Sequence, residues 1–559
     1  MDLFEEHIQK IVKKHVKADV ALQTPPNPEF GDYAVACFPF AKTLKKDPKQ
    51  IAEELAKKFK PDHLIKKATA NGPYLNFFVN KGHWSQSIIQ RILKEKDKYG
   101  SMQLGKGKKA LIEHTSINPN ASPHVGRARN AILGDAIARL LKFQGYKLET
   151  HFFVNDVGKQ IAMLVLGCEG KKKVTFDELL GIYVSISKKI EKHPDMEQKV
   201  FALLNKLEKK DRETMQKFRS VVKTCIDGQT AILNELGIHY DYFDYESDYL
   251  WSRETEKILD RLRDTGKLFE DEEKRLVLDQ QEFNLAMKSP VLVLTRADKT
   301  SLYPLRDMAY TIDKLKKGVH ENILVLGEDQ KLYFQQLAAA LSILNYKAPR
   351  AVHYSFVLLQ EGKMSTRQGN LVLLKDFMEE AVQKAEKEVR KRNPKQNPKK
   401  IKEIADSIGH GAIKYSILKV SPEKNVNFDW EQALSFEGDS GPYLQYAYAR
   451  IQSIFSKHGK KLEHNADFSL LEHPQEQSLV KKLSQFPEIV KSASNSLRPH
   501  LIAVYTYQLA QQFSEFYHSC PILKEKEALK RARLLLAYAV AQVLGTSLWL
   551  LGIDAVESM

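Results

Sequence analysis

The stretch that decides the fold is residues 109–141, KALIEHTSINPNASPHVGRARNAILGDAIARLL. KALIEH is an apolar run typical of a buried strand, and TSINPNASP is a connector broken by two prolines. Helical spacing of apolar residues begins at Ser122, a good N-cap that precedes a proline. Because free N–H groups and the helix dipole favour anions, a strand, a loop and a helix start in this order can hold phosphate. Most such units bind nothing, so the pattern alone leaves a nucleotide site open.

Length and charge narrow the class of protein. At 559 residues the chain is too long for one core, and three to four domains are expected. The formal net charge is +16 and is spread over lysine-rich helix faces, which favours a polyanion, and nucleic acid over an anionic membrane. The four cysteines form no C-x-x-C pair, so we expect neither a zinc site nor a disulfide framework. Without a signal peptide or a long apolar run, we expect a cytoplasmic protein that contacts no membrane.

The composition changes along the chain and predicts several domains. Residues 1–105 are predicted to form a small α+β N-terminal domain that ends at a Gly/Lys linker. Residues 106–400 alternate apolar runs with helices, which predicts a Rossmann-like α/β domain with a parallel sheet, interrupted by a lysine-rich insertion at about 170–235. A connecting helical segment (401–435) and an all-α helical bundle (436–559) follow, with no strand expected after 401. The runs predicted as strands of the α/β domain are ETHFFVND, RLVLD, PVLVLTRAD, NILVLGED and VHYSFVLL.

A second informative stretch is residues 361–374, EGKMSTRQGNLVLL. It follows a predicted strand and gathers Lys363, Ser365 and Arg367 in a short polar loop that could close over a triphosphate. Phosphoryl and nucleotidyl transfers depend mainly on positioning and on positive charge at the developing anion. The alternative is a solvated surface loop that binds no ligand. The phosphate-binding interpretation is favoured because the first helix of the same domain begins with HVG.

Together these motifs resemble a known family. HVG and KMS are similar to the two signatures of class I aminoacyl-tRNA synthetases. Six stretches in order resemble the arginyl-tRNA synthetase family over nearly the whole chain: EHTSINPNASPHVGRARNAILGD, HFFVNDVGKQI, SLYPLRDMAYTIDK, LGEDQKLYFQQL, KMSTRQGN and FEGDSGPYLQYAYARI. The resemblance implies that ATP and L-arginine form arginyl-adenylate and diphosphate. The arginyl group then passes to tRNA(Arg), with AMP released.

The resemblance also implies cofactors, partners and domain roles. Mg²⁺ would bind through the ATP phosphates rather than through a protein cage. The N-terminal domain resembles the family's additional tRNA-binding domain, and the last helices resemble its anticodon-binding domain. A monomer is expected.

The resemblance assigns roles in the reaction to individual residues. The residues matching catalytic positions are His124, Gly126, Arg127, Lys363, Ser365 and Arg367. Those matching the ATP site are Asn120, Pro123, His124, Val125, Gly126, Lys363, Met364 and Ser365. Those matching the arginine site are Glu113, Ser116, Asn118, Tyr310, Asp313 and Gln330. A carboxylate beside an aromatic ring suits a guanidinium, although Asp313 alone could equally form a surface ion pair with a nearby lysine.

Tyrosines with nearby polar and cationic residues predict where RNA binds. Aromatic stacking with interleaved charge is how unstacked RNA bases are held. In the last domain the candidates are Tyr443, Tyr446, Arg450, Tyr505 and Gln508, of which two or three tyrosines are expected to contact RNA and the rest to be core. In the first domain they are Tyr33, Asn71 and Tyr74, a candidate platform for the tRNA elbow.

The chain departs from the family pattern where charge is needed. Arg127 stands where the first signature usually has a second His, and Thr366 replaces the second signature's catalytic Lys. Ala121 occupies the place where a compensating Lys often precedes the first signature, and Gln368 replaces a later basic residue. We therefore hypothesise that Arg127 or Arg367 supplies the charge on the leaving diphosphate, since guanidinium binds phosphate well and stays charged.

These departures keep other functions open. One is a catalytically impaired paralogue that acts as an RNA-binding or regulatory protein, although the retained amino-acid pocket argues against it. Another is a class I synthetase for a different amino acid. A third, a small-molecule nucleotidylyltransferase, does not explain the long helical C-terminal domain.

Overall fold

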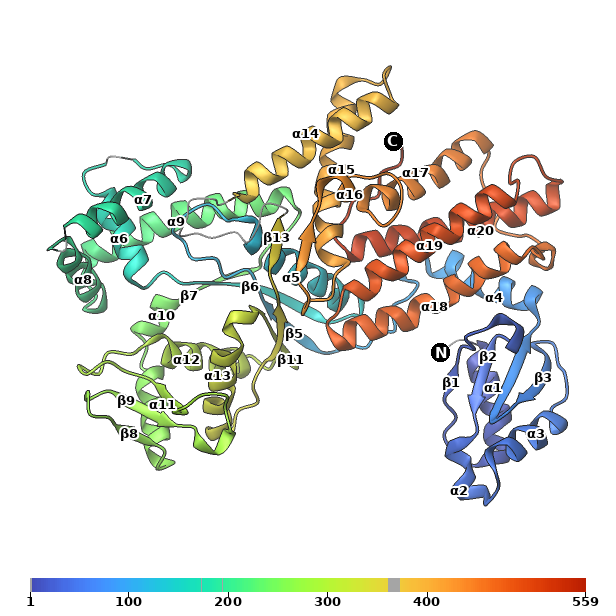
Figure 1. The fold of residues 1–559 in the computed structure, drawn as a ribbon, viewed down its shortest axis with the longest axis horizontal. Helices are drawn as coiled ribbons and strands as arrows, with labels where there is room; N and C mark the ends of the chain where they lie inside the picture. Colours follow the sequence, from blue (N-terminus) through green and yellow to red (C-terminus); the bar gives the residue numbers. More distant parts are fainter. Residues whose placement is uncertain (1–2, 172, 194, 360–371) are drawn as a thin grey trace.

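A five-stranded parallel sheet lies at the centre of the molecule (Figure 1). The computed structural model describes residues 3–171, 173–193, 195–359 and 372–559. The strand order is β12-β11-β5-β6-β7, with every pair parallel. The strands are Lys109–Glu113 (β5), Lys147–Val154 (β6), Tyr242–Tyr245 (β7), Glu321–Gly327 (β11) and Arg350–Tyr354 (β12). The predicted α/β domain with a parallel sheet is confirmed.

Helices pack on this sheet, and further helices form the long connection between β6 and β7. Helix α5 (Val125–Phe143) packs on β5, β6 and β11, because its apolar residues recur at helical spacing on the side that meets the sheet. Among the described residues, four α-helices lie between β6 and β7 and pack on one another. They are α6 (Lys159–Cys168), α7 (Phe176–Lys192), α8 (Asp195–Glu208) and α9 (Arg212–Glu235).

A second, antiparallel sheet corrects part of the strand prediction. RLVLD and PVLVLTRAD supply β9 and β10, which pair with β8 and not with the parallel sheet. Parallel neighbours need a long crossover, usually a helix, and the described residues between these strands contain no α-helix. The elements here are α10 (Glu246–Leu250), α11 (Glu254–Asp264), β8 (Leu268–Glu270), β9 (Leu276–Asp279), β10 (Val291–Val293), α12 (Tyr303–Lys316) and α13 (Lys331–Ile343).

The run VHYSFVLL divides between two sheets. Its second half is β13 (Val357–Leu359), which pairs in parallel with β14 (Val426–Phe428). The expectation of no strand after residue 401 is therefore wrong for β14, whose three residues are too short to give a sequence period. The helices around this pair are α14 (Leu374–Arg392), α15 (Pro398–Leu418) and α16 (Trp430–Ala433).

The N-terminal domain has the predicted α+β composition. Its antiparallel sheet runs β1-β2-β4-β3, and α3 packs against β3 and β4. Helix α4 leaves this sheet and packs against α18 and α20, so it joins the first part of the chain to the last. The elements are α1 (Leu3–Val16), β1 (Leu22–Gln23), β2 (Tyr33–Ala36), α2 (Ala41–Leu44), α3 (Pro48–Lys58), β3 (Ile65–Asn71), β4 (Tyr74–Val79) and α4 (Lys81–Glu95).

The predicted all-α C-terminal domain is also confirmed. It contains α17 (Gly441–His458), α18 (Pro474–Ser496), α19 (His500–Ser519) and α20 (Glu527–Leu550). By length and composition alone α20 is apolar enough to cross a membrane, yet 72% of its most apolar window is buried inside the protein. Helices α4, α5, α17, α18 and α19 all pack against α20. Its hydrophobicity therefore fits its place in the core of the helical domain.

Candidate active site

A cavity of about 640 Å³ opens at the carboxyl ends of the central strands. In open α/β sheets this edge is where ligands bind, beside the strand from which the order runs in both directions. Here that strand is β5, with β11 on one side and β6 on the other. Residues from the ends of β5, β6 and β11 and from α12 and α13 line the cavity.

The loop after β5 is held in a strained backbone shape. Thr115 and Ser116 have φ values of +78° and +37°, a region that residues other than glycine rarely adopt. The Thr115 amide donates to Asn130 Oδ1 at 2.7 Å, and its hydroxyl lies 2.6 Å from the Tyr240 hydroxyl. A Cβ on Gly134 of α5 would lie 2.2 Å from the His114 ring, so this close approach requires glycine. The loop thereby presents Ser116 to the cavity.

A set of amides fixes the next turn of this loop. Asn155 donates to Asn118 Oδ1 at 3.1 Å, while Asn118 and Asn120 both donate to Gln160 Oε1, at 3.3 and 3.1 Å. Gln229 of α9 donates to the Ala121 carbonyl at 2.8 Å. Asn118 lines the cavity, and Asn120 is bonded to Gln160, which also lines it.

The start of α5 lies beside the cavity and is paired with the chain before α14. The Val125 amide donates to the Val372 carbonyl at 3.1 Å, and the Leu374 amide donates to the Pro123 carbonyl at 2.8 Å. His124 is the N-cap of α5, and burial, with Arg127 adding to it, lowers its pKa to about 4. The imidazole is therefore neutral at neutral pH and keeps one N–H to donate.

Five ATP-site candidates occupy this helix start, outside the lining that the described residues form: Asn120, Pro123, His124, Val125 and Gly126. Four candidates lie outside the described residues: Lys363, Met364, Ser365 and Arg367.

Two arginines of α5 have different surroundings. Arg127 lines the cavity, and among the described residues it has no ion-pair partner. Arg129 is 1% exposed and donates to the carbonyls of Ser355 and Ser421, at 2.7 and 3.0 Å. Arg129 therefore ties α5 to the segments that flank β13 and β14, while Arg127 faces the cavity.

One face of α12 forms a wall of the cavity and corrects an expectation. Tyr303, Asp307, Tyr310 and Lys314 all line it, since they recur at helical spacing. Asp313 does not: the helix turns about 100° per residue, and its carboxylate meets the Tyr249 hydroxyl at 3.4 Å and Lys316 at 3.6 Å.

Asp307 is a candidate that the motif analysis missed. It accepts a hydrogen bond from the Tyr333 hydroxyl, and among the described residues it has no cationic partner within ion-pair distance. Burial, together with the charges of Glu246 and Glu113, raises its pKa to about 7. Its place one helical turn after Tyr303 was the available sequence signal. The neighbouring Arg306 is already paired with Glu246 at 2.7 Å.

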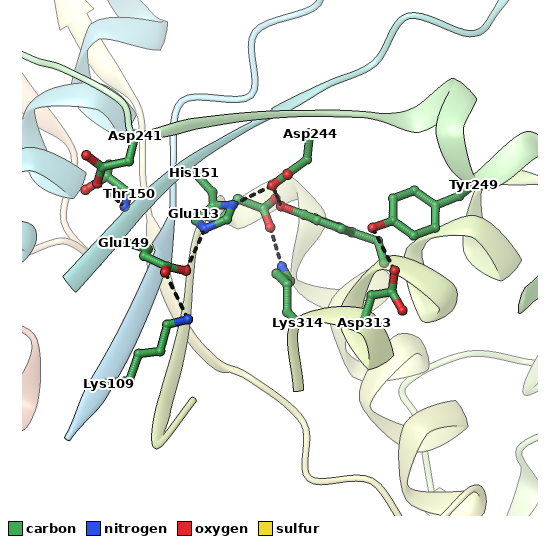
Figure 2. Close-up of polar contacts among 11 residues, drawn as sticks. Lys109, Glu113, Glu149, Thr150, His151, Asp241, Asp244, Tyr249, Asp313 and Lys314 are labelled. Carbon is green, nitrogen blue, oxygen red and sulfur yellow. Dashed lines mark hydrogen bonds and ion pairs between the residues drawn. The ribbon is translucent and has the colours of Figure 1, made fainter. Parts of the chain in front are cut away.

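One wall of the cavity carries a buried ion pair between the end of β5 and α12 (Figure 2). Lys314 is 1% exposed and donates to Glu113 Oε2 at 2.5 Å. Its ammonium lies 3.9 Å from the centre of the Tyr310 ring. Of the other arginine-site candidates, Ser116, Asn118, Tyr310 and Gln330 line the same cavity.

The candidate RNA residues divide into exposed and buried groups. Tyr33 and Tyr505 are 7% and 1% exposed and pack in the core, so their rings are not accessible for stacking on a base in this structure. Tyr505 is therefore one of the tyrosines of the last domain that belong to the core. On α17, Arg450 lies over the rings of Tyr446 and Tyr517, at 4.7 and 5.3 Å, beside a second cavity of about 1130 Å³.

The remaining RNA candidates are at least partly accessible. Tyr443 is half-buried and packs on Tyr507, and Gln508 is exposed and accepts from Lys482. In the first domain, Asn71 and Tyr74 are exposed at the β3–β4 turn.

Comparisons with known proteins cover the whole chain. The family model described as "tRNA synthetases class I (R), catalytic domain" matches residues 88–430. The "DALR anticodon binding domain" matches 444–559, and the "Arginyl tRNA synthetase N terminal domain" matches 2–79.

Relatives and solved structures agree with these matches. The arginine–tRNA ligase of Methanocaldococcus jannaschii is 39% identical over 99% of this chain and 98% of that protein. That of Methanocella arvoryzae is 40% identical over 93% and 92%. The structure of Thermus thermophilus arginyl-tRNA synthetase superposes with a TM-score of 0.83 at 28% identity, covering 99% of both chains. This chain therefore belongs to the arginyl-tRNA synthetase family of class I aminoacyl-tRNA synthetases.

Proposed function

We propose that this chain joins L-arginine to tRNA(Arg) at the expense of ATP. Arginine and ATP form arginyl-adenylate and diphosphate, and the arginyl group then passes to the terminal ribose of the tRNA as AMP leaves. The observation that carries the proposal is the carboxylate of Asp307, which lines the cavity beside the start of α5 and has no described cation within ion-pair distance. A planar cation with paired donors matches a carboxylate better than any neutral side chain does.

The arginine substrate is proposed to lie along α12. Its guanidinium binds Asp307 next to the Tyr303 ring, where the π-face also attracts the cation. Its α-ammonium faces Glu113, because Lys314 occupies only the Oε2 oxygen of that carboxylate. The lining residues proposed to complete this site are Ser116, Asn118, Tyr310 and Gln330.

ATP is proposed to lie against the start of α5. His124 donates a hydrogen bond to phosphate as charge develops, and Arg127 supplies positive charge to the leaving diphosphate. The other residues proposed for this site are Asn120, Pro123, Val125, Gly126, Lys363, Met364, Ser365 and Arg367. Mg²⁺ is proposed to arrive on the ATP phosphates, because this ion keeps several waters and is usually bound through substrate phosphates rather than by an all-protein cage.

Two surfaces are proposed to hold the tRNA. At the anticodon end, bases stack on Tyr446 and Tyr517 beside Arg450, with Tyr443 and Gln508 at the margin. At the elbow, Asn71 and Tyr74 of the β3–β4 turn contact the RNA. Domain boundaries at 105, 400 and 435, a monomeric state and a cytoplasmic setting belong to the same proposal.

The rival function is a catalytically impaired paralogue that only binds RNA, which the departures at Ala121 and Arg127 favour. An aminoacylation assay with bulk tRNA and each standard amino acid separates the two. We expect labelled arginine alone to be incorporated, with ATP–diphosphate exchange that depends on arginine. Incorporation of another amino acid, or tRNA binding without any exchange, would reject the proposal.

A further inference from the structure

A row of polar side chains lies on the face of the central sheet that points away from α5. Successive residues of a strand point to opposite faces, and paired residues of parallel strands share a face. Glu113 of β5 pairs with His151 of β6, which pairs with Tyr242 of β7. Phe153 pairs with Asp244 on the same face. This row meets Tyr310 and Lys314 of α12.

These side chains form one continuous chain of contacts (Figure 2). His151 Nδ1 donates to Asp244 Oδ2 at 2.5 Å, and the Tyr310 hydroxyl donates to the same oxygen at 2.6 Å. The ammonium of Lys314 lies over the Tyr310 ring and donates a hydrogen bond to the Glu113 carboxylate. The chain therefore leads from the sheet interior to the carboxylate proposed to bind the α-ammonium of arginine.

Packing leaves His151 little freedom. It is 0% exposed, and its ring stacks on Tyr242 at 4.8 Å and 20°. Its second nitrogen faces Glu149 at 3.5 Å, and Glu149 pairs with Lys109 at 2.9 Å. The imidazole is thus held between two carboxylates, and only the Asp244 side leads to the cavity.

The contacts on Asp244 fix both its charge and the pose of Tyr310. Burial would raise the pKa of Asp244, but the hydrogen bonds from His151 and Tyr310 hold it below its ordinary value. The Tyr310 ring also stacks on Phe153 at 4.6 Å and 22°. Because its hydroxyl and one face of its ring are both held, the Tyr310 side chain keeps a single orientation. Its ring therefore contacts the Lys314 ammonium in one fixed geometry.

We propose that His151 is a positioning residue for arginine recognition. Acting through Asp244 and Tyr310, it fixes Lys314 and so aims the Glu113 carboxylate into the cavity. Without the Nδ1 donor, Asp244 loses one of its two side-chain donors and Tyr310 loses its fixed acceptor geometry. Arginine then meets a misplaced carboxylate, while the ATP site at the start of α5 is untouched. This inference rests on the proposed role of Glu113.

The test compares His151→Leu with His151→Asn in arginine-dependent ATP–diphosphate exchange with tRNA present. The two new side chains have nearly the same shape, but only Asn keeps a donor close to the Nδ1 position. We expect His151→Leu to raise KM for arginine about tenfold, with kcat and KM for ATP within about twofold of the parent. His151→Asn should stay within about threefold on every parameter.

The possible outcomes distinguish a failure of this inference from a failure of the proposed function on which it rests. Equal KM values for arginine in the Leu and Asn variants, raised or not, would overturn the role of the donor. Should His151→Leu fail to fold, Tyr310→Phe carries the test, and an unchanged KM for arginine there overturns the inference. Glu113→Gln reports on the proposed function: if it leaves KM for arginine unchanged, the arginine site itself is misassigned.

Discussion

At the scale of single residues, Asp307 combines recognition with a cost in stability. Its raised pKa, about 7, means that the folded protein favours the neutral carboxyl. Arginine binds the ionised form, so below pH 7 it must displace a proton. KM for arginine should therefore rise on the order of tenfold per pH unit as the pH falls below 7, and stay level above it. Exchange kinetics from pH 5.5 to 8.5 would measure this, and a flat profile would contradict it.

The same carboxyl predicts the stability of Asp307→Asn. A group whose pKa is raised on folding contributes stability that is present below its unfolded pKa of 3.8 and is lost as the pH rises through the folded value. Asp307→Asn removes this loss, so without substrate it should be more stable than the parent at pH 8, by up to about 4 kcal/mol. The advantage should vanish near pH 4, and arginine activation should be absent. Urea unfolding at both pH values is the measurement.

Arg127 is one of the two arginines proposed to place positive charge on the leaving diphosphate. Arg127→Ala should lower arginine-dependent exchange by more than about tenfold, or roughly 1.4 kcal/mol of transition-state stabilisation. Arg296 is a matched control, because it lines the same cavity but already pairs with Glu208 at 2.6 Å. Arg296→Ala should change exchange much less. Arg367→Ala belongs beside them, since near-normal exchange in both the Arg127 and Arg367 variants would refute a compensating guanidinium.

At the scale of elements, α5 begins at the proposed nucleotide site and also ties neighbouring segments together. Arg129 satisfies the carbonyls of Ser355 and Ser421 in a buried setting. Arg129→Met should leave them unpaired and lower stability by about 2–4 kcal/mol. Arg390 of α14 forms an exposed pair with Glu386, and its side chain has no other partner among the described residues, so Arg390→Met should lower stability by about 1 kcal/mol or less. Equal losses in the two variants, measured by denaturant unfolding, would show that burial of Arg129 does not matter.

The elements also show what the sequence could predict. The β5-α5-β6 unit was predictable because nineteen helical residues with one apolar face follow a buried run. The partners of β9, β10, β13 and β14 were not, because a run of three or four apolar residues encodes burial but no neighbour. The proposed arginine site shows the same limit at the level of single side chains. Motif matching found α12 and Tyr310, but only the direction of each side chain separates Asp307 from Asp313.

At the scale of the whole molecule, the cavity and the Arg450 surface belong to different domains, and the proposed function requires the tRNA to contact both. The net charge of +16 predicts that tRNA affinity falls steeply with salt, because binding releases counterions from the phosphates. Arginine affinity should vary less over the same range, because Glu113 is largely buried and salt screens buried charges much less than exposed ones. This difference makes the tRNA surface testable apart from catalysis.

The final prediction concerns which aromatic residues hold RNA. Base stacking is worth about 1–3 kcal/mol, so Tyr446→Ala and Arg450→Ala should each raise KM for tRNA roughly tenfold, with KM for arginine within about twofold. Tyr505→Phe is the control, because that ring is 1% exposed and its hydroxyl donates to the Lys482 carbonyl within the helical domain. It should leave tRNA kinetics unchanged and lower only thermal stability. A rise in KM for tRNA in Tyr505→Phe without a loss of stability would mean that α18 and α19 open to expose this ring to RNA.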